Sequence, residues 1–191
     1  MISRKIHTVN NFVEFEYLNT DRLKLVRVDQ AVMDHVFNSF SAQEQSDFFG
    51  CDSAQELVEQ ERRYRGGLST FNRKFLYFFL LDKNTNKNMG WCGYHTWYTD
   101  HHRAEIGYTL KPAYHKKRLM TEALEAILEY GFQKMGLRRV EAFLAANNIP
   151  SQKLMNNFGF IKEGVARLHY NVQGKNEDSD FYSLLREEYF T

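Results

Sequence analysis

The stretch from residue 103 to residue 185 constrains the fold of this chain more than any other part, because strand and helix patterns alternate along it. The runs 104–110 and 139–145 have the length and apolar content of buried strands. Between them, residues 120–135 predict an amphipathic helix that Gly136 ends. Its apolar residues recur at three- and four-residue spacing: Leu124, Ile127, Leu128 and Phe132. A chain with this alternation packs its helices against the faces of a sheet.

Further elements are predicted on both sides of that helix. After it, a short helix over residues 150–158 ends at Gly159, and three strands follow at 160–165, 166–172 and 179–185. The first half predicts a strand at 23–28, a helix at 30–40 capped by Asp29, a helix that opens at Asp52 and Ser53 and ends at Arg65, and a hairpin of strands at 75–82 and 89–98. Residues 1–19 are either an extension or include a short strand at 13–18. Together these elements predict an α/β fold, with a mixed sheet and helices on both faces.

The composition is that of one globular domain, and we expect residues 1–191 to form it. A net charge of +1 argues against a general electrostatic grip on nucleic acid or on an anionic membrane. We find no signal-peptide pattern and no run near the ~20 apolar residues of a membrane helix. Cys51 and Cys92 are isolated, so we expect two reduced thiols in a cytoplasmic protein.

The loop before the long helix is a candidate anion site. Lys116, Lys117 and Arg118 are followed by Leu119, Met120 and Thr121 at the expected start of the helix. The first N–H groups of a helix have no backbone partner and attract anions such as a pyrophosphate. A solvated basic turn is the alternative interpretation.

Two further segments carry candidate catalytic groups. Asn148 and Ser151 flank a predicted helix start, where they are either caps or polar groups of a site. Glu105 lies in a predicted strand, where it is either a buried general base with a raised pKa or a partner of Arg103 or Arg139 in an ion pair.

Aromatic residues are dense in the segment 71–97. They form either a thick core, which we favour, or an aromatic-lined groove. His95 and Trp97 share one strand face by period-two alternation, and they line an acceptor groove or pack in the core. His101 and His102 raise the question of a metal, but the set lacks matched carboxylate and cysteine ligands, so we predict no metal site.

A series of short motifs resembles the GNAT superfamily of acetyltransferases, in the branch of ribosomal-protein N-acetyltransferases of the RimJ/RimL type. The motifs follow one another in the family's order: Thr-Asp-Arg-Leu-Lys-Leu at 20–25, Gly-Trp-Cys-Gly at 90–93, Ala-Glu-Ile-Gly-Tyr at 104–108, Met-Thr-Glu-Ala-Leu at 120–124, Asn148-x-x-Ser151, Gly159-Phe160, Glu163-Gly164 and the ending at 183–189. The resemblance implies a single GNAT-like domain with a mostly antiparallel sheet, and it makes residues 103–185 the acetyl-CoA-binding half.

The resemblance also implies a reaction. An acetyl group passes from acetyl-CoA to an amine, a protein N-terminal α-amine or a small-molecule amine, by direct attack in a ternary complex. Residues 116–121 would hold the pyrophosphate of coenzyme A, and Tyr108, Thr109 and Leu110 would pair with pantetheine beside two splayed strands. Asn148 would lie near the pantetheine amides, and Ser151 would protonate the departing thiolate. The acceptor itself and the oligomeric state, a homodimer included, stay open.

One departure from the family pattern concerns the pyrophosphate loop. The family has Gln/Arg-x-x-Gly-x-Gly/Ala, whereas this chain has Arg118 at the first glycine position. Either the loop shifts and its cations compensate, or cofactor affinity is low, or catalysis has been lost. The competing functions are therefore a weakly catalytic acyl-CoA-binding protein and an interaction module built on the same scaffold.

Overall fold

The structure is a computed structural model that describes residues 15–67, 69–70 and 72–191. Its helices are α1 (Gln30–Ser39), α2 (Ala42–Phe49), α3 (Ala54–Arg65), α4 (Leu119–Gln133), α5 (Ile149–Asn157) and α6 (Arg186–Tyr189), with short 3-10 turns at Thr99–His101 and Pro112–Tyr114. Its strands are β1 (Tyr17–Asn19), β2 (Leu23–Val28), β3 (Lys74–Asp82), β4 (Asn88–Tyr98), β5 (Arg103–Leu110), β6 (Arg139–Ala145), β7 (Ile161–Val172) and β8 (Lys175–Leu185).

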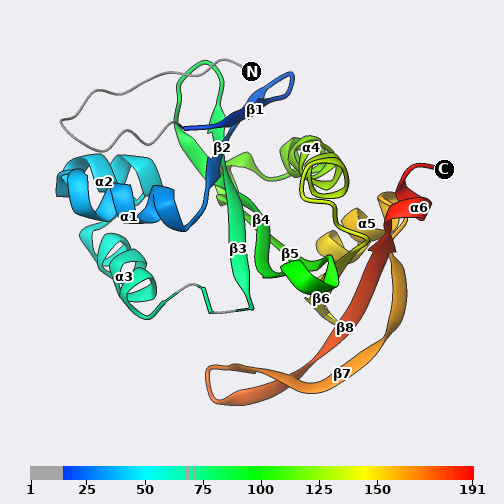
Figure 1. Ribbon diagram of the computed structural model, residues 1–191. Helices are drawn as coiled ribbons and strands as arrows, with labels where there is room; N and C mark the ends of the chain where they lie inside the picture. Colours follow the sequence, from blue (N-terminus) through cyan, green and yellow to red (C-terminus); the bar gives the residue numbers. More distant parts are fainter. Residues whose placement is uncertain (1–14, 68, 71) are drawn as a thin grey trace.

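The strands form one eight-stranded sheet in the order β1-β2-β3-β4-β5-β6-β8-β7. Only β5 and β6 pair in parallel, and the other neighbours are antiparallel. Helices α1, α2 and α3 lie on one side of the sheet and α4 and α5 on the other (Figure 1). The predicted α/β fold, with a mixed and mostly antiparallel sheet between helices, is confirmed.

Local capping explains why the helices begin where they do. Asp29 caps α1 by accepting a hydrogen bond from the Val32 N–H, and Ser53 caps α3, both as predicted. The prediction missed α2, which Ser41 and Glu44 open with reciprocal side-chain and backbone hydrogen bonds. The expected strand over 13–18 falls partly outside the described residues, and β1 begins at Tyr17.

The core is divided between the two faces of the sheet. The larger cluster fills the space between the sheet and α4, around fully buried residues such as Phe78, Tyr94 and Phe132. A smaller cluster lies under α1 and α2 and contains Val36 and Phe75. Much of the dense aromatic segment is therefore core, as favoured from the sequence, although Tyr77 and Trp91 line a cavity described below.

Strands β5 and β6 pair over only part of their length. Their register runs from Arg103↔Arg139 to Glu105↔Glu141, although β5 continues to Leu110 and β6 to Ala145. Beyond Glu105 the two strands separate, as the family resemblance implied. The separation leaves one edge of residues 106–110 without a partner strand. The gap in the sheet lies between the second half of β5 and the start of α5.

The C-terminal hairpin corrects a second expectation. Residues 160–165 and 166–172 were predicted as two strands, but residues 161–172 form the single strand β7, which projects with β8 from the body of the molecule (Figure 1). A register shift between Ala166 and Tyr170, with Leu168 at φ 51°, bulges the strand. A bulge interrupts period-two alternation, so the sequence pattern breaks although the strand continues.

Candidate active site

A cavity of about 550 Å³, which we call the loop cavity, lies where β5 and β6 have separated. It brings together almost all the residues that the sequence assigned to a cofactor: Tyr108, Thr109, Leu110, Lys116, Arg118, Leu119, Met120, Thr121, Asn148 and Ser151. Lys117 is absent from the described lining and points to the Tyr114 ring, with Nζ 5.5 Å from the ring centroid. The volume is within the usual range of small-molecule sites.

The backbone of the basic loop has the shape that glycine favours, without a glycine. Lys116 has φ 60°, and Arg118, the N-cap of α4, has φ 59° and ψ 17°. Both residues are therefore in the left-handed region, where a Cβ costs roughly 1–2 kcal/mol. The loop has not shifted into another conformation to accommodate Arg118. Lys116 and Arg118 instead adopt the left-handed conformation in spite of its free-energy cost.

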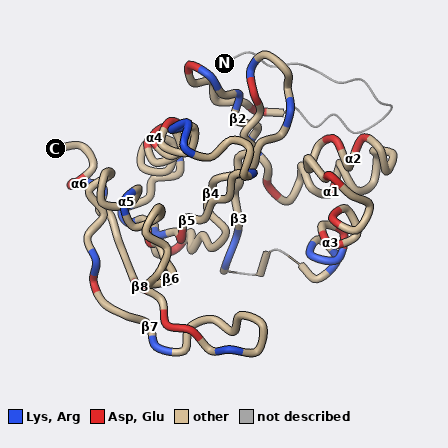
Figure 2. The backbone as a smooth tube through the Cα atoms, turned by 180° about the vertical axis from the view of Figure 1, so that it is seen from behind, with Lys and Arg blue, Asp and Glu red and all other residues tan. Residues whose placement is uncertain are grey.

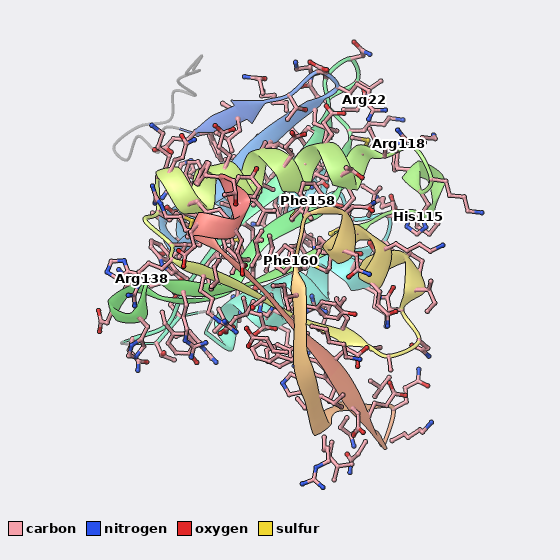
Figure 3. The ribbon with its side chains drawn as sticks, turned by 90° about the vertical axis from the view of Figure 1, so that its right-hand side faces the viewer. Arg22, His115, Arg118, Arg138, Phe158 and Phe160 are labelled. Atoms are coloured by element: carbon pink, nitrogen blue, oxygen red, sulfur yellow. The ribbon has the colours of Figure 1, made fainter. Side chains whose placement is uncertain are left out.

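Contacts from neighbouring segments hold this loop in place. The Arg22 Nη1 donates to the Lys117 carbonyl at 2.9 Å, and its Nε donates to Glu122 on α4 at 2.7 Å. On the other side, the His115 Nε2 donates to the Leu110 carbonyl at 2.7 Å. Arg22, His115 and Arg118 gather at the start of α4 (Figure 3). The loop is thus tied to the residue just before β2, to α4 and to β5, which lowers the entropic cost of binding there.

Glu122 joins two parts of the chain that are far apart in sequence. Burial raises the pKa of this carboxyl, but hydrogen bonds from Thr20 and from the Arg22 backbone and guanidinium outweigh it, so the net pKa is lowered. The carboxylate therefore stays ionised. The negative charge in the first turn of α4 also suits the helix dipole.

Asn148 and Ser151 lie at the start of α5. The Asn148 Oδ1 accepts the Ser151 N–H at 3.2 Å, so Asn148 is a helix cap, and both residues also line the loop cavity. The capping and binding interpretations are therefore compatible at this position. Close by, burial raises the pKa of Tyr108 to about 12, and the nearby Ser151 hydroxyl opposes that rise.

Glu105 lies on the opposite face of β5. Its carboxylate is 3.3 Å from the His95 Nε2, and its side chain is 16% exposed. Neither Arg103 nor Arg139 pairs with it, because both guanidinium groups contact Glu141, at 2.6 and 2.8 Å. The ion-pair alternative for Glu105 is therefore wrong in its partners.

The prediction that His95 and Trp97 share a face is also wrong. Strand β4 has a bulge at His95, because Tyr94 pairs with Ile106 while Thr96 already pairs with Glu105. Trp97 consequently turns to the α4 face, where it packs against the larger core cluster. His95 stays beside Glu105, and the Thr96 hydroxyl lies 3.2 Å from the His95 Nδ1. A bulge of this kind has no signature in period-two counting.

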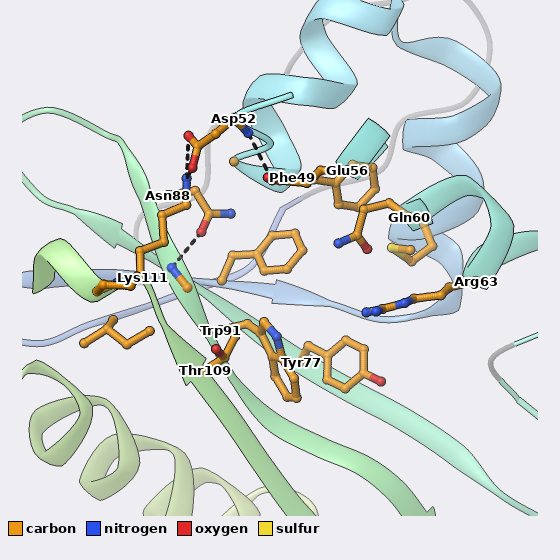
Figure 4. Close-up of a pocket in the computed structure, with 16 residues that line it drawn as sticks. Phe49, Asp52, Glu56, Gln60, Arg63, Tyr77, Asn88, Trp91, Thr109 and Lys111 are labelled. Atoms are coloured by element: carbon orange, nitrogen blue, oxygen red, sulfur yellow. Dashed lines mark hydrogen bonds and ion pairs between the residues drawn. The ribbon is translucent and has the colours of Figure 1, made fainter. Parts of the chain in front are cut away.

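A second cavity of about 450 Å³, the α3 cavity, lies between α3 and the sheet (Figure 4). Phe49, Tyr77 and Trp91 give it an aromatic lining, and Asp52 at its rim pairs with Lys111 at 2.8 Å. Glu56 and Arg63 also line the cavity and lie on α3, a helix that carries both signs of charge (Figure 2), whereas Asp52 precedes the N-cap of that helix. The α3 cavity shares Thr109 and Leu110 with the loop cavity, so the two cavities meet at the end of β5 from opposite faces of the sheet.

Gly107 links the α3 cavity to Glu105. A Cβ on Gly107 would lie 2.7 Å from the His95 Cδ2 and 3.2 Å from the Trp91 ring. Because Gly107 has no side chain, the rings of His95 and Trp91, both from β4, can lie over it on β5. Trp91 lines the α3 cavity and His95 contacts Glu105, so the two rings connect the cavity to the carboxylate.

A family model described as an acetyltransferase (GNAT) domain matches residues 22–161. The chain belongs to the GNAT acetyltransferase family. The acetyltransferase resembles YoaA of Bacillus subtilis, an uncharacterised N-acetyltransferase, with 27% identity over 173 residues that cover 90% of this chain and 98% of that protein. It is also 37% identical over 112 residues to the uncharacterised N-acetyltransferase p20 of Bacillus licheniformis, covering 59% of this chain and 63% of that protein.

Solved structures show the same fold. A GNAT-family acetyltransferase from Bacillus anthracis superposes with a TM-score of 0.65 at 21% identity, covering 91% of this chain and all (100%) of that one. The ribosomal-protein-S5-alanine acetyltransferase of Vibrio fischeri gives a TM-score of 0.63 at 20% identity, covering 91% of this chain and 98% of that one. The acetyltransferase fold predicted from the motifs is therefore confirmed. Among the described residues, no helix is long and apolar enough to cross a membrane.

Sequence reasoning missed two tyrosine side chains at the site. Tyr170 on β7 lies beside the Glu105 carboxylate, and burial together with that carboxylate raises the pKa of Tyr170. His169 packs between Tyr170 and Phe143 in tilted ring contacts, with ring centroids 4.3 and 4.4 Å away. The bulge at Leu168 puts these rings there, and the sequence carries no signal for it. Tyr108 was assigned through its main chain, but its side chain also reaches the loop cavity.

Proposed function

We propose that this acetyltransferase transfers an acetyl group from acetyl-CoA to a primary amine by direct attack. The observation that carries the proposal is the meeting of two cavities at Thr109 and Leu110, one from each face of β5. Acetyl-CoA would occupy the loop cavity and the amine would enter through the α3 cavity. The two substrates then reach the same strand without competing for space, as a ternary complex requires.

The cofactor would be held by groups already in position. The pyrophosphate would lie against the N–H groups at the start of α4, beside Lys116 and Arg118, which line the cavity. Pantetheine would extend along residues 108–110, where β5 has no partner strand on the side of β6. This placement leads the thioester towards the middle of β5, between Ser151 on one face and Glu105 on the other.

The chemistry assigns one proton to each face. The acceptor ammonium gives a proton to Glu105, directly or through water, and the free amine attacks the thioester carbonyl. As the new C–N bond forms, the C–S bond breaks, and the thiolate takes the Ser151 proton. The nitrogen releases its second proton to water, and Ser151 regains a proton from water, while Glu105 returns its own proton to solvent. His95 beside Glu105 would hold the carboxylate in place.

The acceptor class is proposed from the shape of the entry. The aromatic α3 cavity suits an amine that carries an apolar or planar group next to its charge, and the mixed rim of Asp52, Glu56 and Lys111 suits a polar chain beyond it. A peptide with a free N-terminus has both parts. Proteins of similar fold are named for ribosomal protein S5 alanine and for spermidine, so both kinds of amine belong in the screen.

The first test is calorimetric titration with acetyl-CoA and coenzyme A, followed by a screen of alanine-initiated peptides and polyamines. We expect micromolar binding that Lys116→Glu weakens. With the best acceptor, Ser151→Ala and Glu105→Gln should each lower kcat by about 10²-fold or more, whereas Glu187→Gln, an exposed carboxylate on α6, should leave it unchanged. Absence of binding at millimolar cofactor would refute the proposal. Full turnover in Ser151→Ala and Glu105→Gln would refute the assigned roles.

A further inference from the structure

Tyr108 lines the loop cavity and carries a buried hydroxyl. Its oxygen is fully shielded from solvent and has no hydrogen-bond partner of normal geometry among the described residues. Two polar groups act on its pKa: the Ser151 hydroxyl, and the thiol of Cys92, which is opposite Tyr108 in the register of β4 and β5. The ring itself packs against the larger core cluster. The phenol is thus held firmly, while its polar end is unpaired.

An unpaired buried hydroxyl is costly, and most native structures avoid one. Beside a ligand cavity, such a hydroxyl can gain a hydrogen bond when the ligand binds or when a neighbouring side chain rotates, and the cost is then removed. Ser151 is the neighbouring group in this cavity, and it is the residue proposed to protonate the thiolate. The Cys92 thiol is fully buried, and burial raises its pKa, so it is a weak partner for the phenol.

We propose that the Tyr108 hydroxyl donates a hydrogen bond to the Ser151 Oγ in the acetyl-CoA complex, and so directs the single Ser151 proton to the thioester sulfur. The proposal rests on the proposed function and deepens it. Tyr108 would be a positioning residue, because it acts on the reaction through Ser151 and does not itself touch the reacting atoms.

The geometry of a hydroxyl explains how the positioning works. A serine hydroxyl has one proton to donate and two lone pairs with which to accept. If Tyr108 donates its single O–H to one of these lone pairs, the serine proton points away from the phenol, and the sulfur is the acceptor on the open side of the cavity. Burial raises the pKa of Tyr108 to about 12, so the phenol keeps its proton and remains a donor throughout the neutral range.

The free protein provides a test that needs no acceptor. Tyr108→Phe removes the unpaired hydroxyl and keeps the ring, so the melting temperature should stay the same or rise. If the hydroxyl had a structural role instead, the melting temperature would fall. Tyr189→Phe is the matched control, because its hydroxyl donates to the Glu125 carbonyl of α4 at 3.2 Å, and its loss should lower stability.

Kinetics of a double-mutant cycle test the positioning role. We expect Tyr108→Phe to lower kcat about tenfold, the effect of one hydrogen bond, with little change in the KM for acetyl-CoA. In the Ser151→Ala background, Tyr108→Phe should have no further effect on kcat, because the group that it positions is gone. Tyr189→Phe should leave kcat unchanged in both backgrounds.

The outcomes separate this inference from the function beneath it. A wild-type enzyme that turns over and a Tyr108→Phe variant with full kcat would overturn the positioning role alone. Losses that multiply in the double variant would overturn it too, since two independent effects would then be at work. A wild-type protein that binds no coenzyme A and acetylates no amine would overturn the proposed function, and this inference with it.

Discussion

Arg118 offers the sharpest test of the loop conformation, because its backbone and its charge can be separated. The residue has φ 59° and ψ 17° at the N-cap of α4, and no side-chain cap accompanies it. Arg118→Gly removes both the Cβ and the charge. Arg118→Ala removes the same charge and keeps the Cβ. The difference between the two variants therefore isolates the cost of holding a side chain in the left-handed region.

The magnitude follows from two opposing effects. Relief of the left-handed strain should stabilise the glycine variant by roughly 1–2 kcal/mol. The greater freedom of glycine in the unfolded chain offsets roughly 0.5–1 kcal/mol of that gain. We therefore expect Arg118→Gly to be more stable than Arg118→Ala by about 0.5–1 kcal/mol, which in a chain of 191 residues corresponds to a melting temperature roughly 2 °C higher.

Urea unfolding of the free protein, followed by circular dichroism, measures this difference. The midpoint of Arg118→Gly should lie above that of Arg118→Ala at an unchanged slope. Both variants should bind coenzyme A more weakly than the wild type and with a smaller salt dependence, because both have lost the same cation. An alanine variant as stable as the glycine variant would refute the reasoning, since residue 118 would then not be left-handed in solution.

The other predictions concern packing and pH. Gly131→Ala should destabilise the protein by about 2 kcal/mol despite the better helix propensity of alanine, because the new Cβ would lie 2.1 Å from the buried Tyr94 hydroxyl; chemical denaturation measures it, and an unchanged midpoint would contradict the packing of α4. Hydrogen bonds from Arg139 and Ser183 lower the pKa of Glu163 from 4.5 to about 2. Because the folded pKa is the lower one, this stabilisation is complete above pH 4.5 and is lost as the pH falls towards 2. Glu163→Gln should therefore cost about 1 kcal/mol at neutral pH, reduced by solvent screening, and the deficit should vanish near the lower pH in a titration of stability; a deficit independent of pH would contradict it.

Much of the fold follows from local patterns. The cap at Asp29, the three- and four-residue spacing in α4 and the alternation in β2 are properties of contiguous residues, and each of these elements appears within two residues of its predicted bounds. The missed helix α2 also has a local signal, since Ser41 and Glu44 have the spacing of a reciprocal cap. That helix was overlooked, although its pattern is present.

The two bulges mark where local patterns fail. Near Leu168, β7 gains two residues relative to β8. At His95, β4 gains one residue relative to β5, which reverses the face of the β4 residues beyond it. The prediction for Trp97 was wrong for that reason. The position of Tyr170 beside Glu105 was not predictable at all, because it depends on how the β7–β8 hairpin curves over a strand far away in the sequence.

The chain's own sequence determined the order of elements, the family and the identity of the residues around the loop cavity, because those features are written in contiguous motifs. Only the tertiary structure decided which carboxylate was left without an arginine, namely Glu105, and which was not, namely Glu141. It also decided that β5 and β6 separate, and that Tyr108 ends beside Ser151 with its hydroxyl unpaired. These are contacts between residues far apart in the chain, and their partners are chosen by the packing of the whole sheet rather than by any local pattern.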